Sequence, residues 1–259
     1  MPPLAALGLM PFVARTVDTD QFGTFTGEVP RPGSMREAAI AKARAAIAAN
    51  SVRLGLASEG SFGPHPAIPF LAAGREIIVL VDAETGTVIS DAAVSEETNF
   101  GHCTARAGET CKDFLDRIGF PDHAVIVRPN RGEGPALKGI VTGQAVAAAV
   151  NMMAGRSGDG LARIETDMRA HFNPTRMAEI GKLARRFAER LARLCPACGT
   201  PGFGPVRHQP GLPCVACDMP TALVRTVVSG CAACFHELPG PRGDGRRHAS
   251  PAECPECNP

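Results

Sequence analysis

Four pairs of cysteines are the residues of this sequence whose type and spacing point most directly to a chemistry. Each pair has the form Cys-x-x-Cys, and all four lie between residue 195 and the end of the chain: Cys195/Cys198, Cys214/Cys217, Cys231/Cys234 and Cys254/Cys257. Two intervening residues let both thiolates turn onto the same metal ion, and two such pairs complete a tetrahedral site. The sequence therefore predicts two Zn²⁺ ions, each held by four cysteines.

Spacing alone leaves the pairing of these motifs open. The simplest arrangement joins the first pair with the second and the third with the fourth, and an interleaved arrangement is the alternative. Because four thiolates leave no position for water, we expect both ions to be structural. Disulfides or redox-active pairs are the competing interpretation, but a thioredoxin-like Cys-x-x-Cys needs a strand and a helix around it, which this region lacks.

Two further cysteines, Cys103 and Cys111, stand apart from the four pairs. Neither has a second cysteine at metal-binding spacing. We expect each to be a small buried apolar side chain, and a nucleophilic thiol is the alternative.

A second group of candidate residues lies in three polar segments, 18–28, 58–66 and 165–176, which we expect to be loops. Glu59 follows a predicted strand, and ligands of open α/β sheets bind at such ends. Together with Asp20 or Glu28, this carboxylate would hold Mg²⁺ against a phosphorylated ligand. In the competing interpretation, Glu59 is hydrogen-bonded within a turn.

The glycines beside Glu59 would let a ligand approach the backbone closely. Gly60 and Gly63, with Ser61 between them, are therefore candidate cofactor-binding residues. In the third segment, Arg169 could bind phosphate and His171 could assist proton transfer. A capping network around Asn173 is the alternative there.

The elements that must position these residues alternate between helices and strands. Ser34 and Glu37 form a capping box before an alanine-rich helix, and Asn173 and Pro174 suit the start of a long amphipathic helix. Helices are predicted at 35–49, 107–118, 142–153 and 174–194, and strands at 52–57, 76–82, 87–90, 124–128 and 223–229. This order predicts an α/β fold in which helices flank a mixed sheet.

We expect three units along the chain. They are an α/β domain over residues 1–173, a connecting helix over 174–194, and a small zinc-ribbon-like domain with two zinc ions over 195–259. A C-terminal core this small needs bound metal ions as cross-links to be stable.

Composition narrows the function classes. Lys and Arg number 27 against 26 Asp and Glu, so no strong electrostatic field that would attract nucleic acid is indicated. Trp and Tyr are absent, so no aromatic platform for stacking of nucleic-acid bases is indicated either. No run of 18 apolar residues could span a membrane, and the N-terminus lacks the basic start of a signal peptide. We expect a cytoplasmic protein with no membrane partner, while nucleic acid is not excluded.

The chain as a whole resembles a bacterial protein family of unknown function. The shared motifs are DTDxFGTFTGEVxR at 18–31, ASEGSFGPHP at 57–66, ETDMRAHxNPTRM at 165–177, and the CPxCGTPGFG and CxxCNP motifs at 195–204 and 254–259. The resemblance covers nearly the full length, and it implies no particular activity.

A shorter region, residues 28–63, is similar to the Ham1-type inosine triphosphate pyrophosphatases. The likeness places Glu28 at an acidic metal-linked position, Lys42 at a helix lysine and Glu59 at the second acid of an ADDSG motif, where Ser58 replaces the first. It implies Mg²⁺-assisted hydrolysis of a nucleoside triphosphate. Those enzymes begin with a further strand and a phosphate-binding loop, which we expect to be missing from this chain.

Two hypotheses for function follow. The first is a metal-dependent nucleotide (phosphoanhydride) hydrolase that acts on a nucleotide or another phosphorylated small molecule. The second is a non-enzymatic binding module whose zinc domain contacts a protein or nucleic-acid partner. The basic residues of the long helix, among them Lys182 and Arg193, fit the second hypothesis but are also typical of a solvated helix face.

Overall fold

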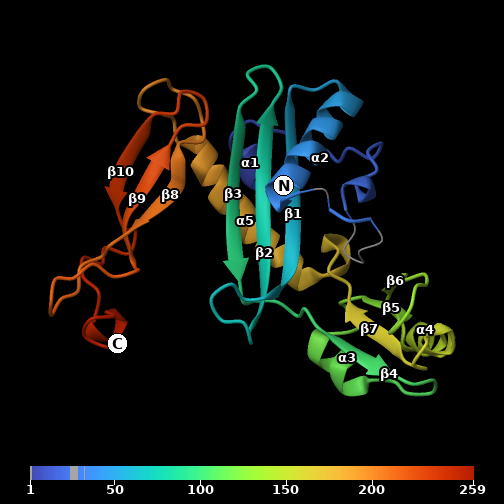
Figure 1. The fold of residues 1–259 in the computed structure, drawn as a ribbon. Helices are drawn as coiled ribbons and strands as arrows, with labels where there is room; N and C mark the ends of the chain where they lie inside the picture. Colours follow the sequence, from blue (N-terminus) through green and yellow to red (C-terminus); the bar gives the residue numbers. More distant parts are fainter. Residues whose placement is uncertain (1, 24–28, 32) are drawn as a thin grey trace.

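The computed structural model describes residues 2–23, 29–31 and 33–259, and its strands form three separate antiparallel sheets. Figure 1 shows the first sheet in the centre of the molecule, the second on one side of its lower end, and the third as an arm on the other side. Helix α5 (Pro174–Ala192) runs between them. The α/β class and the small C-terminal cysteine-rich module are thus confirmed, and every pairing between the named strands is antiparallel.

The first sheet lies between two helices. Its strands are β1 (Leu54–Pro64), β2 (Ala72–Asp82) and β3 (Val88–Ser95), in that order. Alternate residues of β2 face opposite sides, so Ile77, Val79 and Val81 pack under α2 (Met35–Asn50), whereas Ile78 packs under α5. The expected capping box of Ser34 and Glu37 starts α2.

A glycine sets the distance between α2 and this sheet. A Cβ atom on Gly55 would lie 2.4 Å from the carbonyl oxygen of Ala43 and 2.8 Å from Ile47. Alanines on α2 extend the same close approach, because Ala39 and Ala43 are fully buried. The alanine-rich composition of this helix therefore serves tight helix-on-sheet packing.

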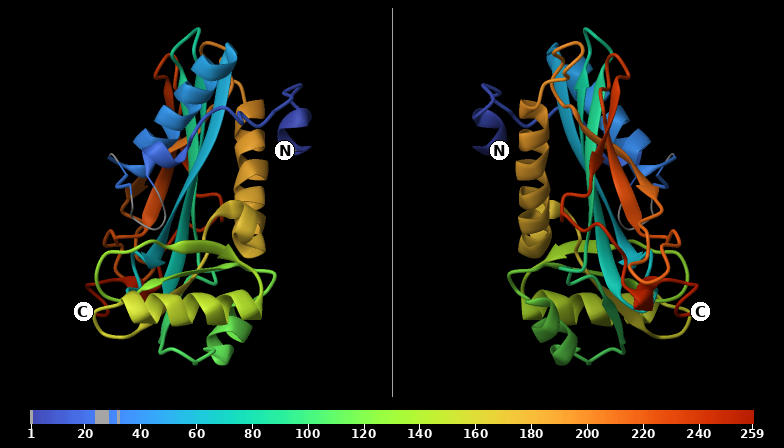
Figure 2. Two further views of the ribbon diagram at one scale, coloured as in Figure 1. Left: turned by 90° about the vertical axis from the view of Figure 1, so that its right-hand side faces the viewer. Right: turned by 90° about the vertical axis from the view of Figure 1, so that its left-hand side faces the viewer.

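The second sheet has the order β4-β7-β5-β6 and carries both of its helices on one face. Its elements are β4 (His102–Ala105), α3 (Lys112–Ile118), β5 (Val125–Pro129), β6 (Leu137–Ile140), α4 (Gly143–Arg156) and β7 (Ala162–Thr166). Figure 2 shows α3 and α4 on the same side of the strands. A core that includes Val125, Val127, Ile164 and Met153 fills the space between them. The opposite face carries the remaining alternate residues of these strands.

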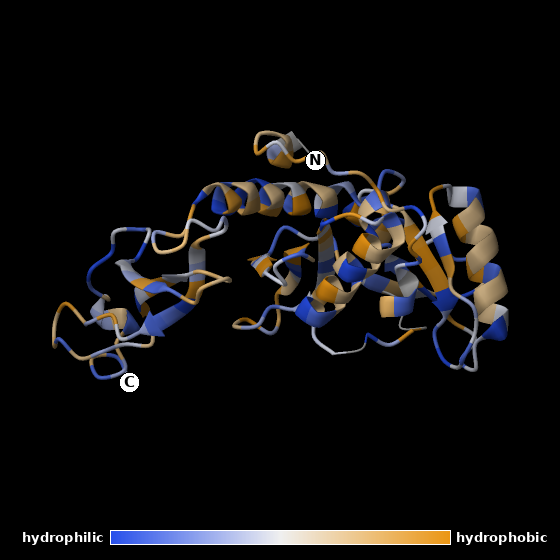
Figure 3. Ribbon diagram, turned by 90° about the horizontal axis from the view of Figure 1, so that it is seen from above, coloured by the Kyte–Doolittle hydropathy of each residue, from blue (hydrophilic) through white to orange (hydrophobic). Residues whose placement is uncertain are grey.

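Helix α5 contacts the first and third sheets and adjoins the second. Its N-cap is Asn173, whose side chain accepts a hydrogen bond from the Arg176 amide and also donates one to Asn99, and Pro174 is the first helical residue. Leu183, Phe187 and Leu191 bury one stripe of the helix against the first sheet. Figure 3 shows α5 leading to the C-terminal module, with polar and apolar residues interspersed along it.

The third sheet belongs to the cysteine-rich module. Strands β8 (Gly204–Pro210), β9 (Val224–Gly230) and β10 (Glu237–Pro241) pair in the order β10-β9-β8. The short elements α1 (Pro2–Ala5), η1 (Asp20–Phe22), η2 (Ala170–Phe172) and η3 (Pro251–Glu253) complete the structure. Within the described residues, no helix is both long enough and apolar enough to cross a membrane.

Arg190 ties the cysteine-rich module to the first sheet. Its guanidinium donates to the carbonyl oxygens of Gly202 at 3.0 Å, Pro205 at 3.0 Å and Ser90 at 2.9 Å. The residue is buried, and among the described residues no carboxylate forms a salt bridge with it. This one side chain therefore satisfies backbone acceptors on both sides of the junction.

Several predicted segments differ from the observed ones. The strand predicted at 52–57 is β1, which continues to Pro64, so the predicted loop 58–66 is mostly strand. Helix α3 begins only at Lys112, because Cys111 has a left-handed backbone with φ 46°. Strands β4, β6, β7, β8 and β10 were not predicted, since they are short or rich in glycine and proline.

We predict that Arg190→Met destabilises the protein and loosens the junction. Three backbone carbonyls, of which that of Gly202 belongs to a buried residue, would lose this donor, which costs about 2–3 kcal/mol in the free energy of unfolding. Urea denaturation measures this loss, and limited proteolysis should cut faster between residues 193 and 204.

The matched control is Arg186→Met on the same helix, whose partly exposed pair with Asp91 should contribute at most about 1 kcal/mol. Equal effects of the two substitutions would contradict the role assigned to Arg190.

Candidate functional site

The eight cysteines of the C-terminal module gather into two groups of four. The first group is Cys195, Cys198, Cys231 and Cys234, and the second is Cys214, Cys217, Cys254 and Cys257. In each group, the four sulfur atoms lie within 4.8 Å of one another, two residues are buried and two are exposed. Both quartets could therefore hold a metal ion.

The distances between sulfurs fit a tetrahedral metal site. Zinc–thiolate bonds of about 2.3 Å at tetrahedral angles place neighbouring sulfurs about 3.8 Å apart. The observed distances are 3.6 Å for Cys198–Cys231, 3.7 Å for Cys195–Cys234, 3.6 Å for Cys217–Cys254 and 3.9 Å for Cys214–Cys257. A disulfide needs about 2.05 Å, so these contacts are not disulfides.

Each cysteine pair sits in a tight turn of the backbone. The residue after the second cysteine is left-handed in three of the turns, with φ 71° at Gly199, 60° at Asp218 and 60° at Phe235. The amide of this residue donates to the carbonyl of the first cysteine, for example Gly199 to Cys195 at 2.9 Å. Hydrogen bonding to Thr200 also lowers the pKa of Cys198 to about 6, whereas the neighbouring Cys198 and burial raise the pKa of Cys234 in the same quartet to about 12.

The pairing is interleaved, so the sequential pairing expected from the sequence is wrong. The first cysteine pair precedes β8 and the third lies between β9 and β10, which places both at one end of the sheet. The second pair lies between β8 and β9, and the fourth follows β10, at the other end. Antiparallel strands return the chain to the same end after every second turn, so alternate pairs meet.

Glu59 is a buried member of an ion-pair cluster under α2. Its two oxygens accept from Arg31 at 2.9 Å and from Lys42 at 2.5 Å, and its side chain is 6% exposed. It lies in the middle of β1, opposite Ile77, and not at the end of a strand as predicted. Lys42 and Glu59 do meet, whereas Glu28 falls outside the described residues and the side chain of Asp20 is not described.

A second buried pair lies on the opposite face of β1. Arg176 Nε donates to Glu76 at 2.6 Å, and its Nη1 donates to the Met168 carbonyl. Burial raises the pKa of Glu76 more than this hydrogen bond lowers it. A Cβ on Gly60 would lie 2.4 Å from Arg176 Nη2, so this glycine makes room for the pair.

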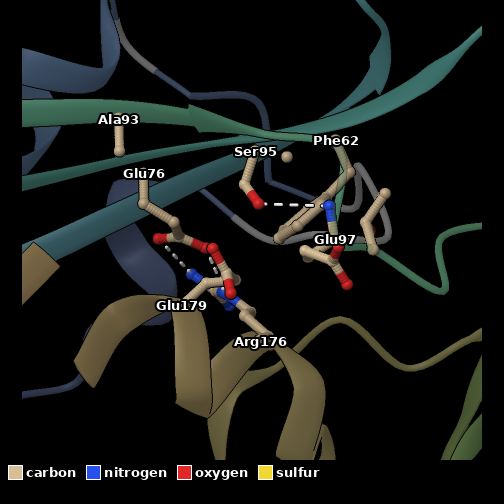
Figure 4. Close-up of a pocket in the computed structure, with 9 residues that line it drawn as sticks. Phe62, Glu76, Ala93, Ser95, Glu97, Arg176 and Glu179 are labelled. Atoms are coloured by element: carbon tan, nitrogen blue, oxygen red, sulfur yellow. Dashed lines mark hydrogen bonds and ion pairs between the residues drawn. The ribbon is translucent and has the colours of Figure 1, made fainter. Parts of the chain in front are cut away.

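The pocket beside this pair is small. Phe62, Ser95, Glu97 and Glu179 line it together with Glu76 and Arg176 (Figure 4). Its volume of about 20 Å³ holds roughly one water molecule, and a nucleotide does not fit. Gly60 therefore faces an occupied ion pair, while Ser61 and Gly63 lie further along β1 and not in a loop.

The third predicted segment also forms internal contacts. Arg169 makes a bidentate pair with the fully buried Asp167, at 2.7 Å for the closest contact, and stacks over Phe172. His171 is exposed and contacts the same ring. Asn173 caps α5, as in the alternative interpretation. In the described part of the chain, the two cysteine quartets are the only groups of potential metal ligands, so a Mg²⁺ site is not seen there.

The two remaining cysteines are structural. Both Cys103 and Cys111 pack against the core of the second sheet. Burial and the neighbouring Cys111 raise the pKa of Cys103 to about 12, so its thiol stays protonated. Both are only half-buried, so the expected packing against the core is confirmed but their full burial is not.

A larger cleft, which no pattern in the sequence indicates, lies near the first quartet. This cleft of about 680 Å³ is bordered by the N-terminal segment, the first sheet, the end of α5 and the first and third cysteine turns. Most of its lining is apolar, including Leu54, Leu80, Ile89 and Leu194. Clefts of about 300–1,000 Å³ are typical of ligand sites.

Comparison with protein families gives one match, to the Domain of unknown function DUF6671, over residues 42–259. The matched range includes both cysteine quartets, α5 and all three sheets. Comparisons with curated proteins and with solved structures give no match.

We predict that double cysteine substitutions reveal the interleaved pairing. Cys195→Ser with Cys231→Ser removes two ligands from one quartet, so the chain should keep one metal ion. Cys195→Ser with Cys214→Ser damages both quartets and should leave fewer than one. Elemental analysis after extensive dialysis measures the metal per chain, with two expected in the parent. The reverse ranking of the two double variants would establish sequential pairing.

Proposed function

We propose that this chain, which belongs to the DUF6671 family, is a non-enzymatic binding protein whose C-terminal module is held by two structural Zn²⁺ ions. The observation that carries the proposal is the tetrahedral spacing of two all-cysteine quartets. All-thiolate tetrahedral sites are typical of structural zinc. We treat residues 195–259 as one folding unit that depends on this metal.

A protein partner fits the surface of the module better than nucleic acid does. Arg207 pairs with Glu237, Arg242 with Asp244 and Arg246 with Glu253, so few cations remain for phosphates. Apolar groups, in contrast, are exposed around the 680 Å³ cleft. Leu194 at its border is 60% exposed, and Phe235, two residues from the lining residue Ala233, is 81% exposed.

We infer that the cleft receives an apolar segment of a protein partner. The zinc ion of the first quartet would then shape one wall of the cleft, through Thr200, Pro201 and Ala233. Arg190 keeps that wall at a fixed distance from the first sheet. Preorganisation of this kind lowers the entropic cost of binding.

We predict that Leu194→Glu abolishes binding of a protein partner by the full-length chain. The substitution places a charge at the apolar border of the cleft, and Leu194 is exposed, so the chain should stay folded. Proteins retained from an extract by the immobilised chain are identified by mass spectrometry after nuclease treatment and a wash with high salt.

Phe70→Glu is the matched control, because Phe70 is also an exposed apolar residue, in the loop before β2 and far from the cleft. A partner retained by the parent and by Phe70→Glu, but lost with Leu194→Glu, is expected. Retention that disappears with nuclease or salt would favour nucleic acid instead.

The hydrolase remains the second candidate, and the contact between Lys42 and Glu59 is the observation in its favour. By the resemblance to Ham1-type enzymes, Lys42 would be the helix lysine and Glu59 the second acid of the ADDSG motif. However, a metal ion at Glu59 would have to displace Arg31 or Lys42, which already occupy both oxygens.

We therefore predict no Mg²⁺- or Mn²⁺-dependent release of pyrophosphate or phosphate from nucleoside triphosphates. Coupled phosphate detection over a panel of triphosphates tests this, with Glu59→Gln and the exposed Glu84→Gln compared with the parent. Turnover that requires Glu59 but not Glu84 would favour the hydrolase over the binding protein as the function of this chain.

A further inference from the structure

The face of the second sheet opposite α3 and α4 carries a cluster of charged residues outside the sites described so far. Val125, Val127 and Ile164 point to the core under α3 and α4. Residues between them on the strands therefore point to the opposite face. These residues include Arg128 on β5, Arg163 and Glu165 on β7, and His102 and Thr104 on β4.

Two arginines lie directly opposite each other on this face. Arg128 pairs with Arg163 in the register of β5 and β7, an arrangement that is destabilising for like charges. Glu165 separates them, and both guanidiniums donate to the same oxygen, Oε1. Two positive charges therefore share one negative charge, and the cluster keeps a net charge of +1.

Arg128 also has a donor without an acceptor. Its Nε is buried and makes no hydrogen bond, and it is the one such side-chain nitrogen or oxygen found among the described residues. The side chains of Arg128 and Arg163 are nevertheless 37% and 27% exposed, so part of each side chain is accessible from solvent. Unsatisfied buried donors are rare in proteins, and a bound acceptor is one explanation for them.

We infer that this face binds the phosphoryl group of a small molecule. Arg128 and Arg163 would supply the planar pairs of N–H donors that suit phosphate oxygens. His102 and Thr104 are exposed on the neighbouring strand, opposite Glu165 and Arg163 respectively, where their side chains can donate further hydrogen bonds. One compact cluster with a net charge of +1 fits a single phosphoryl group, whereas a nucleic-acid backbone needs a row of cationic contacts.

Glu165 would set the affinity of the site. Burial raises its pKa, but hydrogen bonds from Arg128 and Arg163 outweigh this effect, so the net shift is downward and the group is ionised at neutral pH. As an anion it competes with phosphate for the same guanidiniums. A ligand would therefore bind more tightly once this charge is removed.

The test is calorimetric titration of the full-length chain with inorganic phosphate and with pyrophosphate at constant ionic strength. We expect saturable binding by the parent, binding at least about tenfold weaker in Arg163→Gln, and binding several-fold tighter in Glu165→Gln. Arg207→Gln is the matched control, because Arg207 also pairs with a glutamate but has no second arginine in that pair, and its affinity should equal that of the parent.

Tighter binding by Glu165→Gln separates an anion site from a purely structural network. A structural network would lose stability in that variant without gaining affinity for phosphate, and circular dichroism checks that each variant is folded. Absence of saturable binding in both the parent and Glu165→Gln, or unchanged binding in a folded Arg163→Gln, would overturn the proposal. Equal loss of affinity in Arg207→Gln would show non-specific charge attraction and would also overturn it.

Discussion

The burial of one stripe of α5 is the constraint on which the rest of the structure depends. Leu183, Phe187 and Leu191 fix the helix on the first sheet. At its first turn, Asn173 caps the helix and bonds Asn99 in the loop that leads to the second sheet, and Arg176 pairs with Glu76 on the face of the first sheet that α5 covers. Its last turn reaches the cysteine-rich module through Arg190. The apolar residues on one side of α5 thus hold the helix in place. The helix in turn sets the positions of the three sheets, which have few other contacts with one another.

The three sheets are stabilised in different ways. The first and second sheets bury apolar side chains under helices, and hydrophobic burial accounts for their cohesion. The third sheet has no helix above it, and nearly all residues of β8 are exposed. A three-stranded sheet without a hydrophobic face is marginal in water. The two cysteine quartets, one at each end of the strands, could hold metal ions that would supply the cross-links such a sheet lacks. Arg190, buried against backbone carbonyls, then fixes the module to the first sheet.

Local patterns in the sequence were sufficient for some features and not for others. The capping box at Ser34, the cap at Asn173 and the cysteine turns depend on neighbouring residues, so they could be predicted. The pairing of the cysteines depends on β8 and β10. These strands were not recognised in the sequence because they contain prolines, which are uncommon in strands: Pro205, Pro210, Pro239 and Pro241. Gly60 and Gly63 similarly made the second half of β1 resemble a loop. Arg128 and Arg163 become neighbours only through strand register, which no spacing in the sequence reveals.

Charged residues that resemble catalytic residues in the sequence are mostly used inside this fold for structure. Glu59, Glu76 and Asp167 are each buried and each bound by a cation, so their conformations are fixed and their oxygens occupied. Breaking such a buried pair is far more costly than forming it is favourable, which keeps these groups unavailable to a ligand. The groups that remain available to a ligand are those whose charge or apolar surface is not fully covered by partners within the fold. They are the thiolates of the quartets, the apolar border of the cleft, and the two arginines that share one carboxylate. Metal binding by the quartets, apolar contact at the cleft and anion binding at the two arginines are the roles proposed for these three surfaces.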